Sequence, residues 1–244
     1  MTSAIHRYVD KVFVLSLPAE ENKRERMRRL LSEYGISFEF FDAINGNSAR
    51  FDREWHAYAE RPLATQNEKM KMSKLITSRG AWGYLKSGIA LIRRIMDEGH
   101  QRVLILEDDI FLARDFESRI VHFFDQAPSD WKLLFLGASQ GQWEDQEIHE
   151  GYYYPTPMRT NGTFAVAYDR SILRDLLMEV LKMESNYDKE PMSSIMTQYP
   201  RQCLVAYPNM VMADVSKSTI RHARDVAQHA QKVRWQLDLF DLAQ

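Results

Sequence analysis

Three adjacent carboxylates, Glu107-Asp108-Asp109, follow directly on the apolar run at residues 103–106. Such a run is typical of a strand buried on both faces of a parallel sheet, and ligands of open α/β sheets bind outside the carboxyl ends of these strands. Alternation along a strand places Glu107 and Asp109 on the same side. Two carboxylates, completed by phosphate oxygens and water, suit Mn²⁺ or Mg²⁺. The alternative is an acidic turn exposed to water.

The elements that must position this triplet alternate along the chain. Apolar residues at helical spacing precede Gly35 and Gly99, which are typical helix ends. We expect helices at residues 20–34, 82–96, 115–126 and 171–182, and strands at residues 12–15, 38–41, 103–106, 131–136, 163–168 and 203–207. This alternation predicts an α/β domain, Rossmann-type, with a mainly parallel sheet flanked by helices.

Two further segments stand apart from this alternation. Residues 49–74 are polar and have no clear period, which predicts an irregular excursion over the active face. Residues 224–242 carry an apolar stripe that includes Val226, Val233 and Phe240, which predicts an amphipathic C-terminal helix. We expect this stripe to pack on its own domain, with a homodimer or peripheral membrane contact as alternatives.

Composition narrows the class of protein. The 244 residues are 45% hydrophobic and 27% charged with a formal net charge of −2, which suits one globular domain and disfavours nucleic acid as a partner. A single cysteine, Cys203, excludes an intrachain disulfide and a cysteine-based zinc site. The first residues lack the apolar core of a signal peptide, and no apolar run approaches about 20 residues. We therefore expect a cytoplasmic location, with a peripheral position at the inner membrane as the alternative.

The stretch at residues 104–110, around the acidic triplet, resembles the signature of glycosyltransferase family 25, the lipopolysaccharide-type galactosyltransferases and their relatives. Further segments resemble motifs of the same family and follow in the same order, at residues 12–27, 38–46, 133–137, 162–168, 207–208 and 218–220. The resemblance runs from about residue 12 to residue 221. At residues 81–88 the family commonly has Glu-x-Gly-Cys-x-x-Ser-His. This chain keeps Gly83 and Ser87 there but has Ala81, Tyr84 and Gly88.

The resemblance implies a GT-A fold, a nucleotide-sugar donor that is often a UDP-sugar, a divalent metal (Mn²⁺ or Mg²⁺) and inversion at the anomeric carbon. Within a single domain over residues 1–244, it suggests a nucleotide-sugar half at about 1–137, an acceptor-side half at about 138–222, and the C-terminal helix. Glu107 and Asp109 are then expected to bind the metal, with Asp108 beside the donor. His222 lies where many GT-A enzymes place a histidine on the metal.

The order of GT-A elements also suggests the remaining site residues. Arg24 is expected near the nucleotide, and Arg221, or equally Arg224, near the diphosphate. The sequence Asn161-Gly162-Thr163 could bring backbone close to the donor, or form a simple turn. Asp188 is the preferred general base, with Glu190 as its rival, and a helix cap is the alternative for Asp188.

These observations predict a metal-dependent, inverting glycosyltransferase that acts on a glycan or glycolipid acceptor in surface-polysaccharide biosynthesis. A nucleotidyltransferase is a second possibility, but it would be expected to carry a glycine-rich phosphate loop after its first strand. Residues 16–19 contain no glycine. A third possibility is a non-catalytic nucleotide-sugar-binding module, motivated by the departures at residues 81–88.

Overall fold

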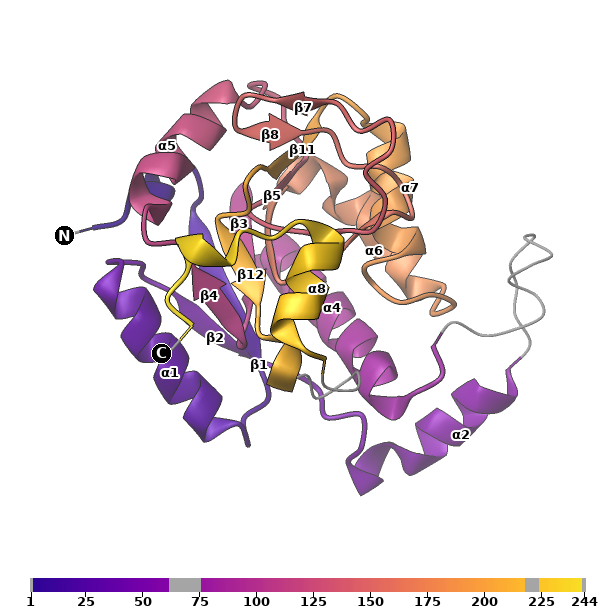
Figure 1. Ribbon diagram of the computed structural model, residues 1–244. Coiled ribbons are helices and arrows are strands. Elements are labelled where there is room, and N and C mark those ends of the chain that lie inside the picture. Colours follow the sequence, from indigo (N-terminus) through magenta and orange to yellow (C-terminus); the bar gives the residue numbers. More distant parts are fainter. Residues whose placement is uncertain (1, 62–75, 218–223, 243–244) are drawn as a thin grey trace.

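The computed structural model describes residues 2–61, 76–217 and 224–242 (Figure 1). Its centre is an eight-stranded sheet with the order β2-β1-β3-β10-β5-β11-β8-β7. The strands are β1 (Lys11–Ser16), β2 (Glu39–Asp42), β3 (Arg102–Glu107), β5 (Leu133–Phe135), β7 (Ile148–His149), β8 (Tyr152–Tyr153), β10 (Ala165–Asp169) and β11 (Cys203–Ala206).

The directions of these strands follow from their pairing. β1 pairs in parallel with β2 and β3, and β5 pairs in parallel with β11. β10 lies antiparallel between β3 and β5, so β5 and β11 point the same way as β1. β8 is antiparallel to β11, and β7 reverses the direction again. Six of the eight strands therefore share one direction, and the expected mainly parallel sheet is confirmed.

Helices cover both faces of the sheet (Figure 1). Successive strand residues alternate between two apolar clusters, as Val12 and Val14 join one and Phe13 joins the other. The helices that contribute to the first cluster are α1 (Glu21–Glu33), α5 (Phe116–Gln126) and α8 (Val226–Val233). Those of the second are α2 (Asp52–Glu60), α4 (Arg79–Glu98), α6 (Leu173–Leu181) and α7 (Glu190–Gln198). Helices therefore cover both faces of the sheet, which explains why its strands are continuously apolar. The expected α/β class is thus confirmed.

Two small ribbons stand at the carboxyl edge of the sheet. β4 (Ile110–Leu112) follows β3 and pairs antiparallel with β12 (Val211–Ala213). β9 (Thr160–Asn161) precedes β10 and pairs antiparallel with β6 (Ser139–Gln140). Short 3₁₀ helices complete the described elements: η1 (Ala4–Arg7), η2 (Ala49–Phe51), η3 (Arg170–Ile172), η4 (Val215–Lys217) and η5 (Leu237–Leu239).

The irregular excursion expected at residues 49–74 is wrong for its first part. Residues 49–60 form η2 and α2, whereas residues 62–75 lie outside the described residues. The helix is held by aromatic packing, since the ring centroids of Trp55 and Tyr58 lie 6.1 and 6.5 Å from that of Trp82. Two aromatic residues in a helix of nine residues form too short a pattern to be read against the polar background.

The predicted C-terminal helix is correct in its packing and wrong in its length. α8 ends at Val233 because Arg234 adopts a left-handed conformation, with φ of 57°. The chain then turns back, and Phe240 forms an antiparallel bridge with Ala113. Val233 and Phe240 are both buried against the first apolar cluster, which confirms packing on the same domain.

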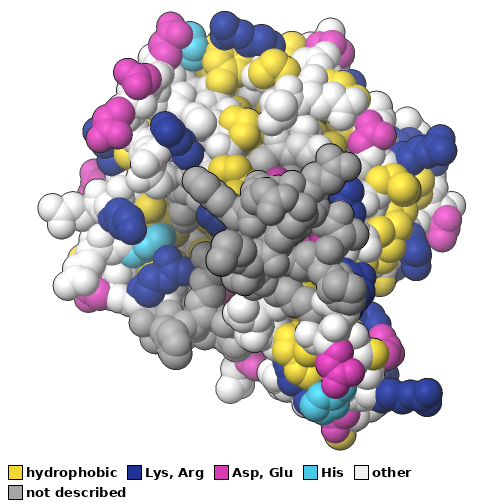
Figure 2. All heavy atoms as spheres, turned by 90° about the vertical axis from the view of Figure 1, so that its right-hand side faces the viewer, with side chains coloured by type: hydrophobic (Ala, Val, Ile, Leu, Met, Phe, Trp, Pro, Cys, Tyr) yellow, Lys and Arg dark blue, Asp and Glu magenta, His cyan; other side chains and the backbone are white. Residues whose placement is uncertain are grey.

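The described surface carries charges of both signs. Figure 2 shows Lys and Arg side chains interspersed with Asp and Glu side chains around one face. Within the described ranges, no helix is both long enough and apolar enough to cross a bilayer.

Candidate active site

A cavity of about 1180 Å³ opens at the carboxyl edge of the sheet. Its walls come from the end of β3, the start of α4, the loops before β10 and α7, the end of β12, and α8. The predicted site residues that line it are Glu107, Asp109, Asn161, Gly162, Thr163 and Asp188. Arg24, Asp108 and Glu190 are not among the lining residues, and Arg221 and His222 lie outside the described residues.

Glu107 is the last residue of β3. Its backbone N–H donates to the carbonyl of Phe164 at 2.8 Å, at the point where β10 begins. Its Oε1 accepts a hydrogen bond from the Tyr84 hydroxyl at 2.7 Å, and that hydroxyl lies 2.9 Å from Thr163 Oγ1. Burial, and then the charge of Asp109, raise the pKa of Glu107 to about 8. The carboxylate is therefore enclosed by protein although it reaches the cavity.

Asp109 has an unsatisfied oxygen. Among the described residues, no hydrogen-bond partner reaches its buried Oδ1. Burial raises the pKa of Asp109 to about 6, although Lys23 opposes the shift. The Asp109 carbonyl accepts from the backbone N–H of Asp214 at 2.6 Å, because β12 pairs with β4 and delivers Asp214 there. Asp214 also lines the cavity, and sequence reasoning missed it because that pairing joins distant residues.

Asp108 points away from the cavity, as strand alternation predicts. Its Oδ2 accepts from the Ser16 hydroxyl at 2.7 Å, and its Oδ1 lies 3.5 Å from the Lys23 ammonium. Arg24 donates to the Ser16 carbonyl at 3.0 Å and pairs with Asp42, so it lies at the ends of β1 and β2. The nearby bases of α1 thus lie behind the acidic cluster rather than among the residues that line the cavity.

The Asn161-Gly162-Thr163 segment is both a turn and a cavity wall. Gly162 has φ of 90°, a conformation that L side chains rarely adopt. This turn leads from β9 into β10 and places the Thr163 hydroxyl beside Tyr84. Within the described part of the chain, the buried Asn161 Oδ1 has no hydrogen-bond partner, while Nδ2 donates to the Arg159 carbonyl at 3.0 Å.

Asp188 precedes α7 and lies at the cavity with only 9% of its surface exposed. Its charge contributes to the raised pKa of Glu107, which places the two carboxylates in one electrostatic environment. The N-cap of α7 is Lys189, so the structure does not make Asp188 the cap residue. Glu190 is the first residue of α7, and its backbone N–H donates to Ser185 Oγ at 3.3 Å.

Basic side chains on α8 and just before it line one side of the cavity. Arg224, His229 and Lys232 all line the cavity. Arg224 Nη1 lies 3.3 Å from His229 Nδ1, and the His229 ring packs edge-on against Trp235 with centroids 5.0 Å apart. His229 was missed by sequence reasoning. Its signal was present, because the polar face of the predicted amphipathic helix carries it next to the apolar stripe.

The departures at residues 81–88 share one face of α4. Ala81 and Tyr84 line the cavity, and Gly88 lies against Tyr187. Gly83 and Ser87, which agree with the family pattern, face the loop after β2 instead. Ser87 Oγ accepts from the Ile44 N–H at 2.8 Å, and a Cβ on Gly83 would lie 2.6 Å from the backbone nitrogen of Gly46. The kept residues therefore dock the helix, and the changed residues shape the cavity side.

The acidic residues fit a divalent cation in part. Among the described residues, no three His, Cys, Asp or Glu side chains converge as a ready-made metal site. Asp109, with its unsatisfied oxygen, and Glu107, with its charge disfavoured by burial, are nonetheless oxygen ligands that a cation would stabilise. Mg²⁺ commonly takes one or two carboxylates and completes its coordination with substrate phosphates and water. Two carboxylates suit that arrangement.

Comparison with known proteins gives consistent relatives. Residues 9–186 match the family model described as Glycosyltransferase family 25 (LPS biosynthesis protein). Procollagen galactosyltransferase 2 of Mus musculus is 23% identical over 164 residues, which cover 59% of this chain and 24% of that protein. Procollagen galactosyltransferase 1 of Danio rerio is 24% identical over 215 residues, which cover 81% and 35%.

A third relative has a different name. Inactive glycosyltransferase 25 family member 3 of Homo sapiens is 28% identical over 150 residues, which cover 58% of this chain and 24% of that protein. The chain spans about a quarter to a third of the length of these curated relatives. The family match covers well over half of the 244 residues and includes the acidic triplet, and so the chain belongs to glycosyltransferase family 25.

Proposed function

We propose that this chain transfers a hexose from a nucleotide-sugar donor, a UDP-sugar, to a glycan or glycolipid acceptor, with inversion and with Mn²⁺ or Mg²⁺ as cofactor. The observation that carries the proposal is the cavity at the carboxyl edge. It joins the carboxylates of Glu107, Asp109 and Asp188 to the bases of α8 in one space. A nucleoside diphosphate needs positive charge, and a sugar hydroxyl that reacts needs a base.

The acidic side and the basic side of the cavity would each bind part of the donor. Asp109 and Glu107 would hold the metal, which neutralises charge on the departing diphosphate. Arg224 and Lys232 supply further positive charge at the cavity. Asn161 has a buried side-chain carbonyl oxygen that can accept a hydrogen bond from a hydroxyl group of the sugar or ribose.

Transfer then needs one base. The acceptor oxygen attacks the anomeric carbon, the bond from that carbon to the diphosphate oxygen breaks, and its electron pair leaves with the diphosphate. Asp188 takes the proton of the acceptor hydroxyl as the new glycosidic bond forms. Asp188 suits this role because it lines the cavity, whereas Glu190 begins α7 and is not a lining residue.

The family supports the choice of donor and acceptor class. Its description names lipopolysaccharide biosynthesis, and two relatives are named procollagen galactosyltransferases. A galactosyl donor is therefore the first to test, and a saccharide of a surface polysaccharide is the first acceptor. We place the reaction in the cytoplasm, with acceptor glycolipid reached from the membrane surface.

A non-catalytic module is the second candidate, because one relative is named an inactive family member. Hydrolysis of the donor distinguishes the enzyme from the non-catalytic module. The wild-type chain is incubated with UDP-galactose, UDP-glucose and UDP-N-acetylglucosamine, with Mn²⁺ or with chelator, and melting temperature and release of UDP are followed. Metal-dependent stabilisation with slow UDP release supports the enzyme. Stabilisation without release, also with saccharide acceptors present, supports the module, and no response to any UDP-sugar contradicts both.

A further inference from the structure

The hydroxyl of Tyr84 lies between two polar groups of the cavity. It is 2.7 Å from Glu107 Oε1 and 2.9 Å from Thr163 Oγ1. Tyr84 donates its single hydroxyl proton to Glu107, so in the second contact Thr163 donates to Tyr84.

The ring of Tyr84 is fixed as firmly as its hydroxyl. α4 carries it, and that helix is docked through Ser87 onto the loop after β2. On its other side the ring packs edge-on against Tyr187, with centroids 6.0 Å apart and planes at 85°. Tyr187 is buried, and its hydroxyl bonds to Tyr168. The hydroxyl of Tyr84 therefore has little freedom to follow a moving carboxylate.

Gly88 belongs to the same arrangement. A Cβ at this position would lie 2.8 Å from Cε2 of Tyr187, closer than real Cβ contacts allow. A larger residue at position 88 would push the Tyr187 ring and, through it, Tyr84. The absence of a side chain at Gly88 thus makes room for the ring that supports Tyr84.

We propose that Tyr84 is a positioning residue whose hydroxyl fixes the carboxylate of Glu107 for the divalent cation, and that Gly88 allows this by admitting Tyr187. Holding Oε1 restricts rotation of the carboxylate and so leaves Oε2 in a defined place. Groups that orient a metal ligand in this way are worth about 10–100-fold in metal affinity. The inference rests on the proposed function only in taking Glu107 as a metal ligand.

The test measures binding of Mn²⁺ alone by isothermal titration calorimetry, beside the melting temperature of each variant. Tyr84→Phe removes the hydroxyl and keeps the ring. Tyr187→Phe is the matched control, because its hydroxyl bonds to Tyr168 rather than to a carboxylate. We expect Tyr84→Phe to weaken Mn²⁺ binding about 10–100-fold and Tyr187→Phe to leave it unchanged. Equal affinities for wild type and Tyr84→Phe, or an equal loss in both variants, would overturn the proposal.

A second pair covers the case that Tyr84→Phe does not fold. Thr163→Val removes the hydroxyl that donates to Tyr84, and Thr163→Ser keeps it. Weaker Mn²⁺ binding in the valine variant alone supports the proposal, and equal binding in the two variants opposes it. If wild type binds Mn²⁺ and no variant differs, only the role of Tyr84 fails. If wild type does not bind Mn²⁺ at all, the proposed metal dependence fails and the role of Tyr84 fails with it.

Discussion

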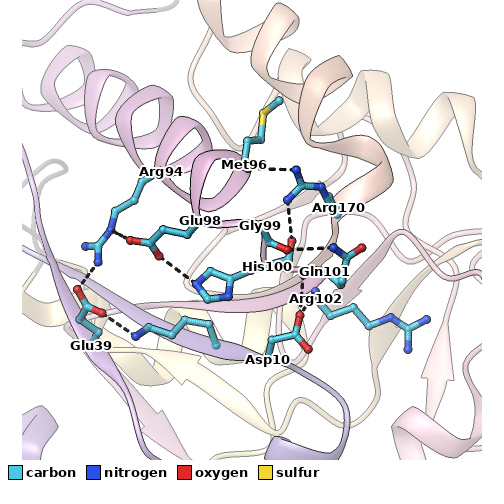
Figure 3. A network of polar contacts seen from close by, with 11 residues as sticks. Asp10, Glu39, Arg94, Met96, Glu98, Gly99, His100, Gln101, Arg102 and Arg170 are labelled. Carbon is cyan, nitrogen blue, oxygen red and sulfur yellow. Dashed lines mark hydrogen bonds and ion pairs between the residues drawn. The ribbon is translucent and has the colours of Figure 1, made fainter.

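The two edges of the central sheet treat charge in opposite ways. At the amino edge, opposite charges are paired (Figure 3). Glu39 accepts from Lys11 at 2.6 Å and also pairs with Arg94, which in turn holds Glu98 at 2.6 Å. Asp10 accepts the backbone N–H groups of Gln101 and Arg102 at the start of β3.

At the carboxyl edge, Asp108 and Asp42 are also paired, with Lys23 and Arg24, but the cavity brings other carboxylates together. Glu107, Asp109, Asp188 and Asp214 all line the cavity there, and Asp109 and Asp214 follow the ends of β3 and β12. The pKa values follow this difference: Lys11 and Arg94 hold the pKa of Glu39 below its usual range, while burial raises the pKa of Glu107 to about 8. One edge is arranged for stability, and the other keeps charge that a ligand can satisfy.

The largest effect is expected from Asp109→Asn. Replacing the carboxylate with an uncharged amide should weaken Mn²⁺-dependent UDP binding by more than about 100-fold, since residues that merely orient a ligand are worth about 10–100-fold. The melting temperature should not fall, because a buried like-charge repulsion is also removed. Asp10→Asn is the matched control at the amino edge, and calorimetry should show normal UDP binding there. Unchanged UDP affinity in Asp109→Asn would remove the distinction between the edges.

Asp188→Asn tests the second acidic group of the cavity. Losing a general base costs about 10²–10⁴ in rate. We expect slow transfer with normal donor affinity, and Glu190→Gln close to wild type. The measurements are steady-state transfer rates and the dissociation constant of the UDP-sugar. A slow Glu190 variant beside a normal Asp188 variant would assign the base to α7 itself.

A fall in pH should change the stability contributed by the two edges in opposite directions. A carboxyl whose pKa is raised in the folded state binds more protons folded than unfolded, so Glu107 costs stability as pH rises from its ordinary value of 4.5 towards 8. The metal-free melting temperature should fall over this range, and Glu107→Gln should reduce the fall. Glu39 has a lowered pKa, so its stabilisation is lost in acid, as pH falls below 4.5. Identical pH profiles for wild type and Glu107→Gln would contradict the raised pKa.

The smallest effect belongs to the amino edge. Arg94→Met keeps the aliphatic stem and loses the ion pairs with Glu39 and Glu98. Partly exposed pairs contribute about 0.2–1 kcal/mol each, so the loss should appear as a fall of a few degrees in melting temperature. Mn²⁺ affinity should stay as in wild type. A change in Mn²⁺ affinity would show that the two edges are coupled through α4.

Local patterns were enough to predict one part of the site. Strand alternation predicted Glu107 and Asp109 on one side, and both line the cavity while Asp108 does not, although Asp108 and Asp109 form a turn after β3. Pairing between distant strands was not readable. Asp214 reaches Asp109 through the β4–β12 ribbon, and β10 enters the sheet between β3 and β5, without a local signal for either.

The helices show the same limit. Periodicity placed α1, α4, α5 and α6 close to their observed bounds. It extended the C-terminal helix beyond Val233, where α8 ends, because the left-handed conformation of Arg234 is set by packing rather than by residue type. Trp235 explains the turn, since its indole N–H donates to the Ala138 carbonyl at 2.8 Å inside the domain. The packing of the stripe was predictable, and the break in it was not.

Anomalous diffraction from crystals grown with Mn²⁺ and UDP tests the metal assignment most directly. We predict a manganese peak in the cavity at coordination distance from the Asp109 carboxylate. The Asp109→Asn protein, treated in the same way, should show no such peak. UDP bound in the cavity of wild type without manganese, with an affinity unchanged by chelator, would contradict a metal-dependent site at the carboxyl edge.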